Sequence, residues 1–310
     1  MANVIYDNFY LSNEVEDQYN SHLNLQQFCT VDNSLTGTAG MIRKINRYRA
    51  SDGTEKLTMG QGNTKSIEVR YSPYEYKIQM AQNRFDYYDE QEMTDPMLVP
   101  VGVRHMGTDM FNTVNKDIFA EYNKASRVLL VASLGFDAFA DSQAMFNLEN
   151  IENVNFFAFV HPADVAALRK ALGTSLQYVE SFARNGYIGT VAGTNLYTKK
   201  DATRHIICTA TKDAVTLFNK KGTEVEIPKR SADEANTRKN SIFSRKYYLA
   251  ALTHDQYAVR IIKGTAAVST DTTVTAGKLY YIQSGLGYEV VEPVEGDSPK
   301  TKGWYEITVG

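Results

Sequence analysis

Apolar residues recur every three or four positions in the stretch that follows Pro96 and Pro100. The members of this stripe are Val103, Met106, Met110, Val114, Ile118 and Tyr122. This spacing predicts one long amphipathic helix over 101–124, roughly 36 Å in length. Pro100 suits the first turn of such a helix. We expect Gly102 and Gly107 to be exposed weak points within it.

An earlier part of the chain shows a different pattern. Two strand-like runs, Met41–Arg49 and Ser66–Met80, flank a polar segment rich in Gly, Ser, Asp, Asn and Thr. The pattern predicts a long hairpin with a loose tip, spanning about 33–50 Å. A polar two-stranded hairpin of that length is not stable alone, so it must lean on something else.

The first residues carry a stripe of period four. Leu11, Val15, Tyr19 and Leu23 predict a short amphipathic helix, and Asn13 with Glu16 resembles a capping box. The first thirty residues contain four acidic residues and no Lys or Arg. An acidic arm of this kind cannot bury its apolar stripe alone, so we expect it to dock on the body or on a neighbour.

From Ser133 onward, short helices and strands alternate. We predict a helix over 136–150, a buried strand in "NFFAFV" and a helix over 161–173 that stops at Gly173. Pro162 would open that helix, with Asp164 near its positive end and His161 as a capping or packing residue. Strands are expected over 204–219 and on either side of "THDQ". The Thr-rich segment 265–310 is expected to be a small β appendage.

Charge is distributed unevenly, although the net charge is only −3. Residues 42–80 contain eight basic residues against four acidic ones, and the basic set in the hairpin includes Arg43, Lys44, Arg47, Arg49, Lys56 and Lys65. The next segment reverses the sign, with Arg84 alone against Asp86, Asp89, Glu90, Glu92 and Asp95. The near-neutral total argues against a chain built to bind nucleic acid by bulk charge.

No constellation of catalytic or metal-binding residues emerges. The glycines of "GYIGTVAGT" (Gly186, Gly189, Gly193) match neither phosphate-binding motif and do not open a helix, so we interpret them as hairpin turns. His205 and Cys208 would lie in one strand at odd spacing, on opposite faces, which argues against a nucleophile pair. We therefore expect no cofactor, no metal and no enzyme activity.

The chain also lacks signals for export or membrane insertion. The first twenty residues have no basic region followed by an apolar one, so a signal peptide is not expected. No apolar run approaches the ~20 residues needed to span a bilayer, and we expect no membrane partner. The two distant cysteines make no disulfide framework.

The order of these parts resembles the major capsid proteins of tailed bacteriophages, which share the Hong Kong 97 fold. "FVHPADVAALRKAL" followed by "GYIGTVAGTNLYT" is similar to the strand, helix and glycine hairpin of that family's A domain, and "RKNSIFSRKYYLAALTHDQYAVRIIKG" is similar to its closing strands. The resemblance covers about 1–263 and depends on the order of short motifs.

The resemblance implies an α+β fold in six segments. These are an N-terminal arm (1–40), an E-loop hairpin (41–80), a P domain with the long spine helix (81–131), an A domain (132–244), strands returning to the P-domain sheet (245–263) and a C-terminal β extension (264–310). His161, Pro162 and the three glycines would be structural residues of the A domain. The resemblance then implies that scaffolding is a separate protein or unnecessary.

The implied function is a major capsid protein whose hexamers and pentamers form an icosahedral or prolate phage head around double-stranded DNA. Portal, scaffolding and decoration proteins would be partners, and the protein would enter the virion after assembly in the host cytoplasm. The family's E-loop lies over an adjacent subunit. We therefore hypothesise that the basic hairpin packs near a neighbour's acidic strip; the alternative is that both are ordinary solvated faces.

Two other protein classes remain open. The same fold builds encapsulin nanocompartments, which enclose enzymes. A β-rich adhesin that binds glycans through the Tyr- and Thr-containing tail is a second alternative, although the long helix argues against it. Covalent Lys–Asn cross-linking, known in some capsids, is not predicted, because nothing singles out an Asn or Glu partner for Lys56 or Lys65.

Overall fold

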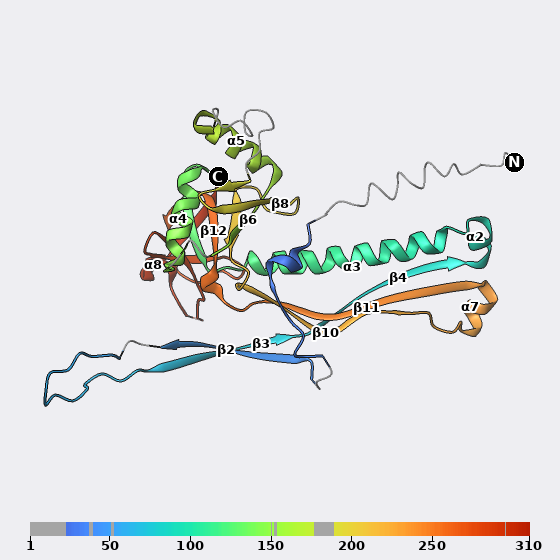
Figure 1. Ribbon diagram of the computed structural model, residues 1–310, viewed down its shortest axis with the longest axis horizontal. Coiled ribbons are helices and arrows are strands. Elements are labelled where there is room, and N and C mark those ends of the chain that lie inside the picture. The colour runs from blue at the N-terminus through green and yellow to red at the C-terminus, as the bar shows by residue number, and fades with distance from the viewer. Residues whose placement is uncertain are drawn as a thin grey trace.

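A computed structural model describes residues 23–36, 40–50, 53–149, 151, 154–176, 189–294 and 296–310. The helix expected over 11–23 and the turn expected at Gly186 therefore lie outside the described residues, apart from Leu23. The chain forms a body, a long limb and a protruding two-stranded ribbon that leaves the molecule in the direction opposite to the limb (Figure 1).

The limb consists of a long helix packed on a four-stranded sheet. The helix α3 (Leu98–Tyr122) lies on a sheet with the strand order β1 (Thr30–Asp32), β10 (Val215–Glu226), β11 (Lys239–Leu252) and β4 (Gln79–Tyr88). Short helices α2 (Asp89–Thr94) and α7 (Ala232–Thr237) close its far end. The predicted helix is thus confirmed, with Pro100 in its first turn.

The apolar stripe of α3 faces the sheet as predicted, with one exception. Met106, Met110, Val114, Ile118 and Tyr122 are buried, whereas Val103 is exposed. The expectation for Gly102 was wrong. Its Cα faces the ring of Phe85, and an added Cβ would lie only 2.6 Å from that ring. Gly102 therefore permits a close helix–sheet contact, while Gly107 is exposed as expected.

The ribbon consists of β2 (Ile42–Ala50) and β3 (Val69–Lys77), which pair antiparallel over nine residues. This confirms the predicted hairpin. The second run was predicted to continue to Met80, but β3 ends at Lys77 and β4 begins at Gln79. Ile78 alone separates the ribbon from the limb.

The body is a nine-stranded sheet with helices on one face. Its strand order is β15 (Tyr305–Val309), β13 (Tyr280–Ser284), β14 (Gly287–Val291), β5 (Arg127–Val131), β12 (Ala258–Val268), β9 (Ile206–Ala210), β6 (Phe156–Val160), β8 (Thr194–Thr198) and β7 (Thr190–Val191). All of "FFAFV" is buried, which confirms the predicted strand. The two helices are α4 (Phe136–Phe146) and α5 (Pro162–Leu176), and α5 continues past Gly173, where we expected it to stop.

Limb and body share one core. The C-terminal half of α3 packs with the body through Tyr122, Phe157 and Phe159, whose rings contact one another at centroid distances of 5.4–5.7 Å. The hydroxyl of fully buried Tyr122 donates a hydrogen bond to the carbonyl of Phe28, 2.5 Å away, at the last residue of η1 (Leu25–Phe28). Burial raises the pKa of Tyr122 well above its ordinary value.

The resemblance implied that the strands of 245–263 return to the P-domain sheet, and in the structure they are divided between two sheets. β11 lies in the limb sheet, but β12 pairs with β5 and β9 in the body. The short η3 (Asp255–Tyr257) between them redirects the chain. Conversely, β10, from the predicted A domain, belongs to the limb sheet, and β5, from the predicted P domain, belongs to the body.

The C-terminal segment is not a separate appendage. The first half of β12 pairs with β5 and β9, and its second half, Gly264–Val268, pairs with β15. Because β14 pairs with β5 and β13 pairs with both β14 and β15, the pairings close a ring of five strands. Gly264 permits the closure, since a Cβ there would meet the carbonyl oxygen of Thr308 at 2.1 Å. Val128, Ile262 and Tyr281 form the buried cluster of the ring. The short helix α8 (Pro299–Lys302) precedes β15 in the chain.

Candidate inter-subunit surfaces

The ribbon is fixed to the limb at its base. Ile78 is 3% exposed, and its N–H donates to the carbonyl of Met41 at 2.8 Å. The hydroxyl of Tyr76 donates to the carbonyl of Leu252 at 3.3 Å. The guanidinium of Arg43 lies 5.5 Å from the centre of the Phe218 ring, on the first part of β10. These contacts hold the base, while the rest of the ribbon extends away from the limb (Figure 1).

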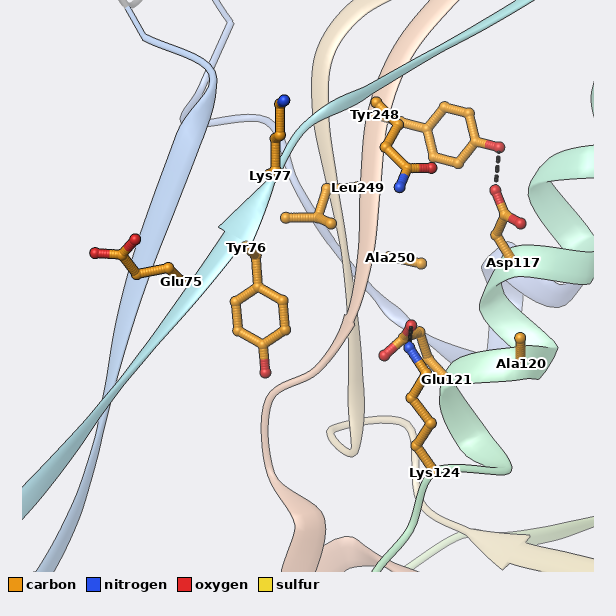
Figure 2. Close-up of a pocket in the computed structure, with 11 residues that line it drawn as sticks. Glu75, Tyr76, Lys77, Asp117, Ala120, Glu121, Lys124, Tyr248, Leu249 and Ala250 are labelled. Atoms are coloured by element: carbon orange, nitrogen blue, oxygen red, sulfur yellow. Dashed lines mark hydrogen bonds and ion pairs between the residues drawn. The ribbon is translucent and has the colours of Figure 1, made fainter. Parts of the chain in front are cut away.

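A cavity of about 400 Å³ lies between this base and the limb (Figure 2). Glu75, Tyr76 and Lys77 line it from β3, and Asp117, Glu121 and Tyr248 line it from the opposite side. The Tyr248 hydroxyl donates to Asp117 at 2.5 Å, and burial together with this hydrogen bond raises the pKa of Tyr248. The lining mixes both charge signs and presents no nucleophile beside a base, so it offers no evident catalytic chemistry.

The tip of the ribbon is held by its own hydrogen bonds. The carboxylate of Glu55 accepts from the N–H and the hydroxyl of Thr64, both at 2.8 Å, and hydrogen bonding from Thr64 lowers the pKa of Glu55. Gln61 N–H donates to Thr58 O at 3.1 Å across a turn whose third residue, Gly60, has φ +89°. Met59 stands at the apex of this turn and is fully exposed. The tip that we expected to be loose contains a hydrogen-bonded turn, and this turn presents a methionine.

The basic residues of the hairpin differ in their surroundings. Arg43 contacts Phe218, and Lys44 forms an ion pair with Glu75 at 2.5 Å, so both are engaged within the chain. Arg47 and Arg49 lie on β2, and their side chains are outside the described part of the structure. No ion pair between described residues involves Lys56 or Lys65, which are exposed at the tip.

Three carboxylates of the acidic strip are also engaged within the chain. Asp86 pairs with Lys239 and Arg84, at 2.9 and 2.8 Å. Asp89 binds Arg230 and Asn240, and Glu90 pairs with Arg238 at 3.1 Å. Glu92 and Asp95 form no ion pair with another described residue. Asp95 does accept a hydrogen bond from Met97 N–H at 3.0 Å. The strip is therefore partly a clamp that ties α2 and β4 to the segment around α7.

Sequence reasoning missed the basic half of this clamp. Arg230, Arg238 and Lys239 lie about 140–150 residues from their partners and carry no local motif. The signal available was the basic cluster "KR" and "RK" on either side of a capped short helix. Nothing in the pattern indicated which acidic cluster would meet it.

The A-domain candidates occupy structural positions. His161 Nδ1 accepts a hydrogen bond from Ala163 N–H at 3.1 Å, the contact that a capping residue makes, and Pro162 is the first residue of α5. Gly193 (φ +77°) follows Ala192 (φ +47°) in the two-residue turn between β7 and β8, where both positions need positive φ. The carbonyl of Gly189 accepts from Leu196 N–H at 3.0 Å.

His205 corrects another expectation. It precedes β9 with φ +66° instead of lying within the strand, and its N–H donates to buried Asp164 at 2.7 Å. Cys208 is fully buried, and its pKa is raised to about 12 by that burial, which makes it an unreactive thiol. Among the described residues, no group of three or more His, Cys, Asp or Glu is placed to hold a metal ion, and no helix is long and apolar enough to cross a membrane.

Comparison with known proteins finds similarity in structure alone. No family model matches the chain, and no curated protein matches it. A structure from Mycobacterium phage Che8 superposes with a TM-score of 0.59 at 14% identity, covering 75% of this chain and 89% of that one. The capsid of cyanophage P-SCSP1u gives a TM-score of 0.58 at 12% identity, covering 76% and 86%.

A shell protein of another kind is similar to the same degree. The SrpI encapsulin of Synechococcus elongatus gives a TM-score of 0.56 at 12% identity, covering 77% of this chain and 86% of that one. The fold is therefore that of phage capsid proteins, as the sequence resemblance to the Hong Kong 97 fold implied. It is a fold that builds closed protein shells.

Proposed function

We propose that this chain is the major capsid protein of a tailed phage, which assembles into hexamers and pentamers of a head shell around double-stranded DNA. The observation that carries the proposal is the combination of this fold with a ribbon that projects away from the chain's own limb and ends in an exposed methionine. Leu57, Ile67, Val69 and Tyr71 of the same projection are exposed as well. Exposed apolar residues that gather on one projection indicate a surface that is buried against a partner.

In this proposal the ribbon is the E-loop, the limb is the P domain and the body is the A domain. Portal, scaffolding and decoration proteins are the expected partners, and the virion is the expected location after assembly in the host cytoplasm. The chain has a structural role and no catalytic one. The small negative net charge suits an inner wall along which DNA can be packed without tight binding.

We narrow the interface hypothesis to the charged residues that form no ion pair within the described part of the chain. Lys56 and Lys65 at the tip would pack near Glu92 and Asp95 of a neighbour, with Met59 inserted between apolar side chains there, such as Met93 and Met97, which are 80% and 57% exposed. Each exposed ion pair contributes only about 0–1 kcal/mol, but repetition over a closed shell multiplies weak contacts.

Electron microscopy of the purified protein, combined with its sedimentation profile, tests the proposal. Uniform closed shells, or hexamers and pentamers that convert to shells, are expected. A protein that stays monomeric when scaffold and portal are supplied would contradict it.

An encapsulin-like compartment is the second candidate, favoured by the similarity to the SrpI shell. The contents of the particles separate the two functions. Nuclease-protected DNA in particles isolated from the native source supports the phage head, whereas a co-purifying enzyme supports the compartment.

A further inference from the structure

The hydrogen-bonding pattern of the ribbon shows which of its edges is open. Ile78 N–H donates to Met41 O, so this pair is hydrogen-bonded, and in an antiparallel ladder every second pair shares that state. The pair formed by Pro73 and Asn46 then falls in the non-bonded set, as it must, because proline has no N–H to donate. On β2, the outward-facing groups are those of Ile42, Lys44, Asn46, Tyr48 and Ala50.

The two outer edges of the ribbon are not equivalent. On β3 the outward N–H is missing at Pro73, in the middle of the strand, and proline on an outer edge hinders further pairing. The outer edge of β2 contains no proline over its nine residues, and β2 pairs with no strand other than β3 in the described part of the chain. An isolated two-stranded ribbon is marginally stable, so the open β2 edge is suited to a third strand.

A second open edge runs along the limb. Asp89 N–H donates to Arg238 O, so this pair is hydrogen-bonded and every second pair between β4 and β11 is not. The backbone groups of the non-bonded residues Met80, Gln82, Arg84 and Asp86 therefore face away from β11. The ten pairs between β4 and β11 run without a bulge, and β4 contains no proline. Met80, Gln82 and Arg84 are exposed, and α3 contacts the intervening Asn83 and Phe85 instead.

Other open edges in the described structure are short or irregular. β1 has three residues and β7 has two. β10 has register shifts on both sides of Lys221, beyond the part that β1 covers. A long, regular, uncovered edge such as that of β4 is one that proteins protect or pair.

We propose that β2 of one copy adds to the open edge of β4 in a second copy through main-chain hydrogen bonds, extending the four-stranded limb sheet to six strands across the subunit boundary. The inference rests on the proposed function as a self-assembling shell protein. The chain's own ribbon cannot make this contact, because it leaves the limb in the opposite direction (Figure 1). The contact is therefore head-to-tail, and such contacts generate rings when the rotation closes.

Charge favours this pairing over a pairing of β2 with itself. The segment 42–50 carries four basic residues and no acidic one, so two antiparallel copies of β2 would place like charges opposite each other. β4 carries one basic and one acidic residue, Arg84 and Asp86, which pair with each other, and it leads into the acidic residues Glu92 and Asp95. Main-chain bonds supply the affinity in strand addition, and side chains select the partner.

Proline substitutions at outward-facing positions test the proposal. Asn46→Pro and Gln82→Pro each remove one outward N–H while leaving the bonds of β2 to β3 and of β4 to β11 in place. We expect the concentration needed for half-maximal assembly to rise about tenfold or more for each. The matched controls Asn46→Ala and Gln82→Ala keep the N–H and are expected to assemble as the wild type does. Proline variants that assemble like their alanine controls would overturn the inference.

Hydrogen exchange gives a test that needs no variant. In shells compared with dissociated subunits, the amides of Lys44, Asn46 and Tyr48 and of Gln82 and Arg84 are expected to gain protection, in contrast to the already bonded amides beside them. Shells in which these amides exchange as in free subunits would overturn the strand addition and leave the proposed function intact. Failure of the wild-type chain to form any shell would instead remove the proposed function.

Discussion

Arg230 and Asp89 lie 141 residues apart, and the guanidinium of Arg230 binds both carboxylate oxygens of Asp89. Asn240 also donates to this carboxylate, at 2.8 Å. The pair joins the segment before α7 to the first turn of α2, at the far end of the limb. A planar guanidinium that binds both oxygens of a carboxylate fixes geometry better than a single contact does, so the pair sets how α2 and the segment before α7 meet.

This clamp predicts a pH dependence at the end of the limb. The hydrogen bond from Arg230 holds the pKa of Asp89 below its ordinary value. A depressed carboxyl pKa stabilises the fold above the unfolded value of about 3.9, and the contribution is lost as the pH falls through the folded value. We expect the amides of α7 and the strand after it to lose hydrogen-exchange protection below about pH 4, before the body does.

Asp89→Asn is the variant that isolates the effect. The variant is expected to show weakened hydrogen-exchange protection around α7 already at neutral pH. The difference in protection between the variant and the wild type should vanish as the pH falls through the folded pKa of Asp89. A variant whose α7 amides exchange like those of the wild type at pH 7 would show that the ion pair does not hold the segment.

Two glycines in α3 predict opposite effects of the same substitution. Gly102→Ala would place a methyl group against the ring of Phe85, and overpacking of this kind costs about 1–3 kcal/mol, which outweighs the gain in helix propensity. Gly107→Ala adds a methyl group where no atom lies within 4 Å, so we expect a gain of up to about 1 kcal/mol. Denaturant unfolding of unassembled subunits measures both. Equal signs for the two variants would contradict the packing described here.

The C-terminal ring predicts that the last strand is essential to the body. Trp304, just before β15, is 6% exposed and lies against the ring of Tyr280 at 5.9 Å. Trp304→Ala is expected to lower the free energy of unfolding by about 3–5 kcal/mol, and deletion of 304–310 to give insoluble protein. Leu286→Ala is the control, because Leu286 is 66% exposed and its loss should cost less than about 0.5 kcal/mol. A soluble, cooperatively folded deletion variant would contradict this prediction and would favour the separate β appendage expected from the sequence.

Local patterns predicted the elements, and long-range pairing decided the rest. The stripe from Met106 to Tyr122, the buried strand 156–160 and the hairpin follow from spacing over a few residues, whereas the break at Ile78 was not predicted. The placement of β12 in the body, the ring closed by β15 and the clamp of Arg230 on Asp89 depend on partners far apart in the sequence. The Thr-rich composition of 265–310 resembled an independent module because nothing in it shows that Thr308 approaches Gly264.

The candidate interface stays a prediction that rests on runs of like charge. These runs drew attention to the hairpin and to the start of α2. They did not show that Lys44 and Arg43 are held by Glu75 and Phe218, because those contacts need the β2–β3 register and the position of β10. The exposed Met59 gave no sequence signal, since a single methionine in a polar turn has no period.

A charge exchange between the two ends of the molecule gives a final prediction. Lys56→Glu with Lys65→Glu would replace attraction by repulsion at the proposed contact, and we expect assembly to require a higher protein concentration, most clearly at low salt, because surface pairs are screened above about 0.1 M. Adding Glu92→Lys and Asp95→Lys to the same chain restores opposite charges across the boundary and should recover part of the assembly. Arg43→Glu is not an informative substitute, since Arg43 packs on Phe218 within its own subunit. Light scattering across a salt series measures the effect, and subunit unfolding curves control for stability. If the variant with all four substitutions assembles no better than the variant with two, the ribbon tips contact some other surface of the neighbouring copy.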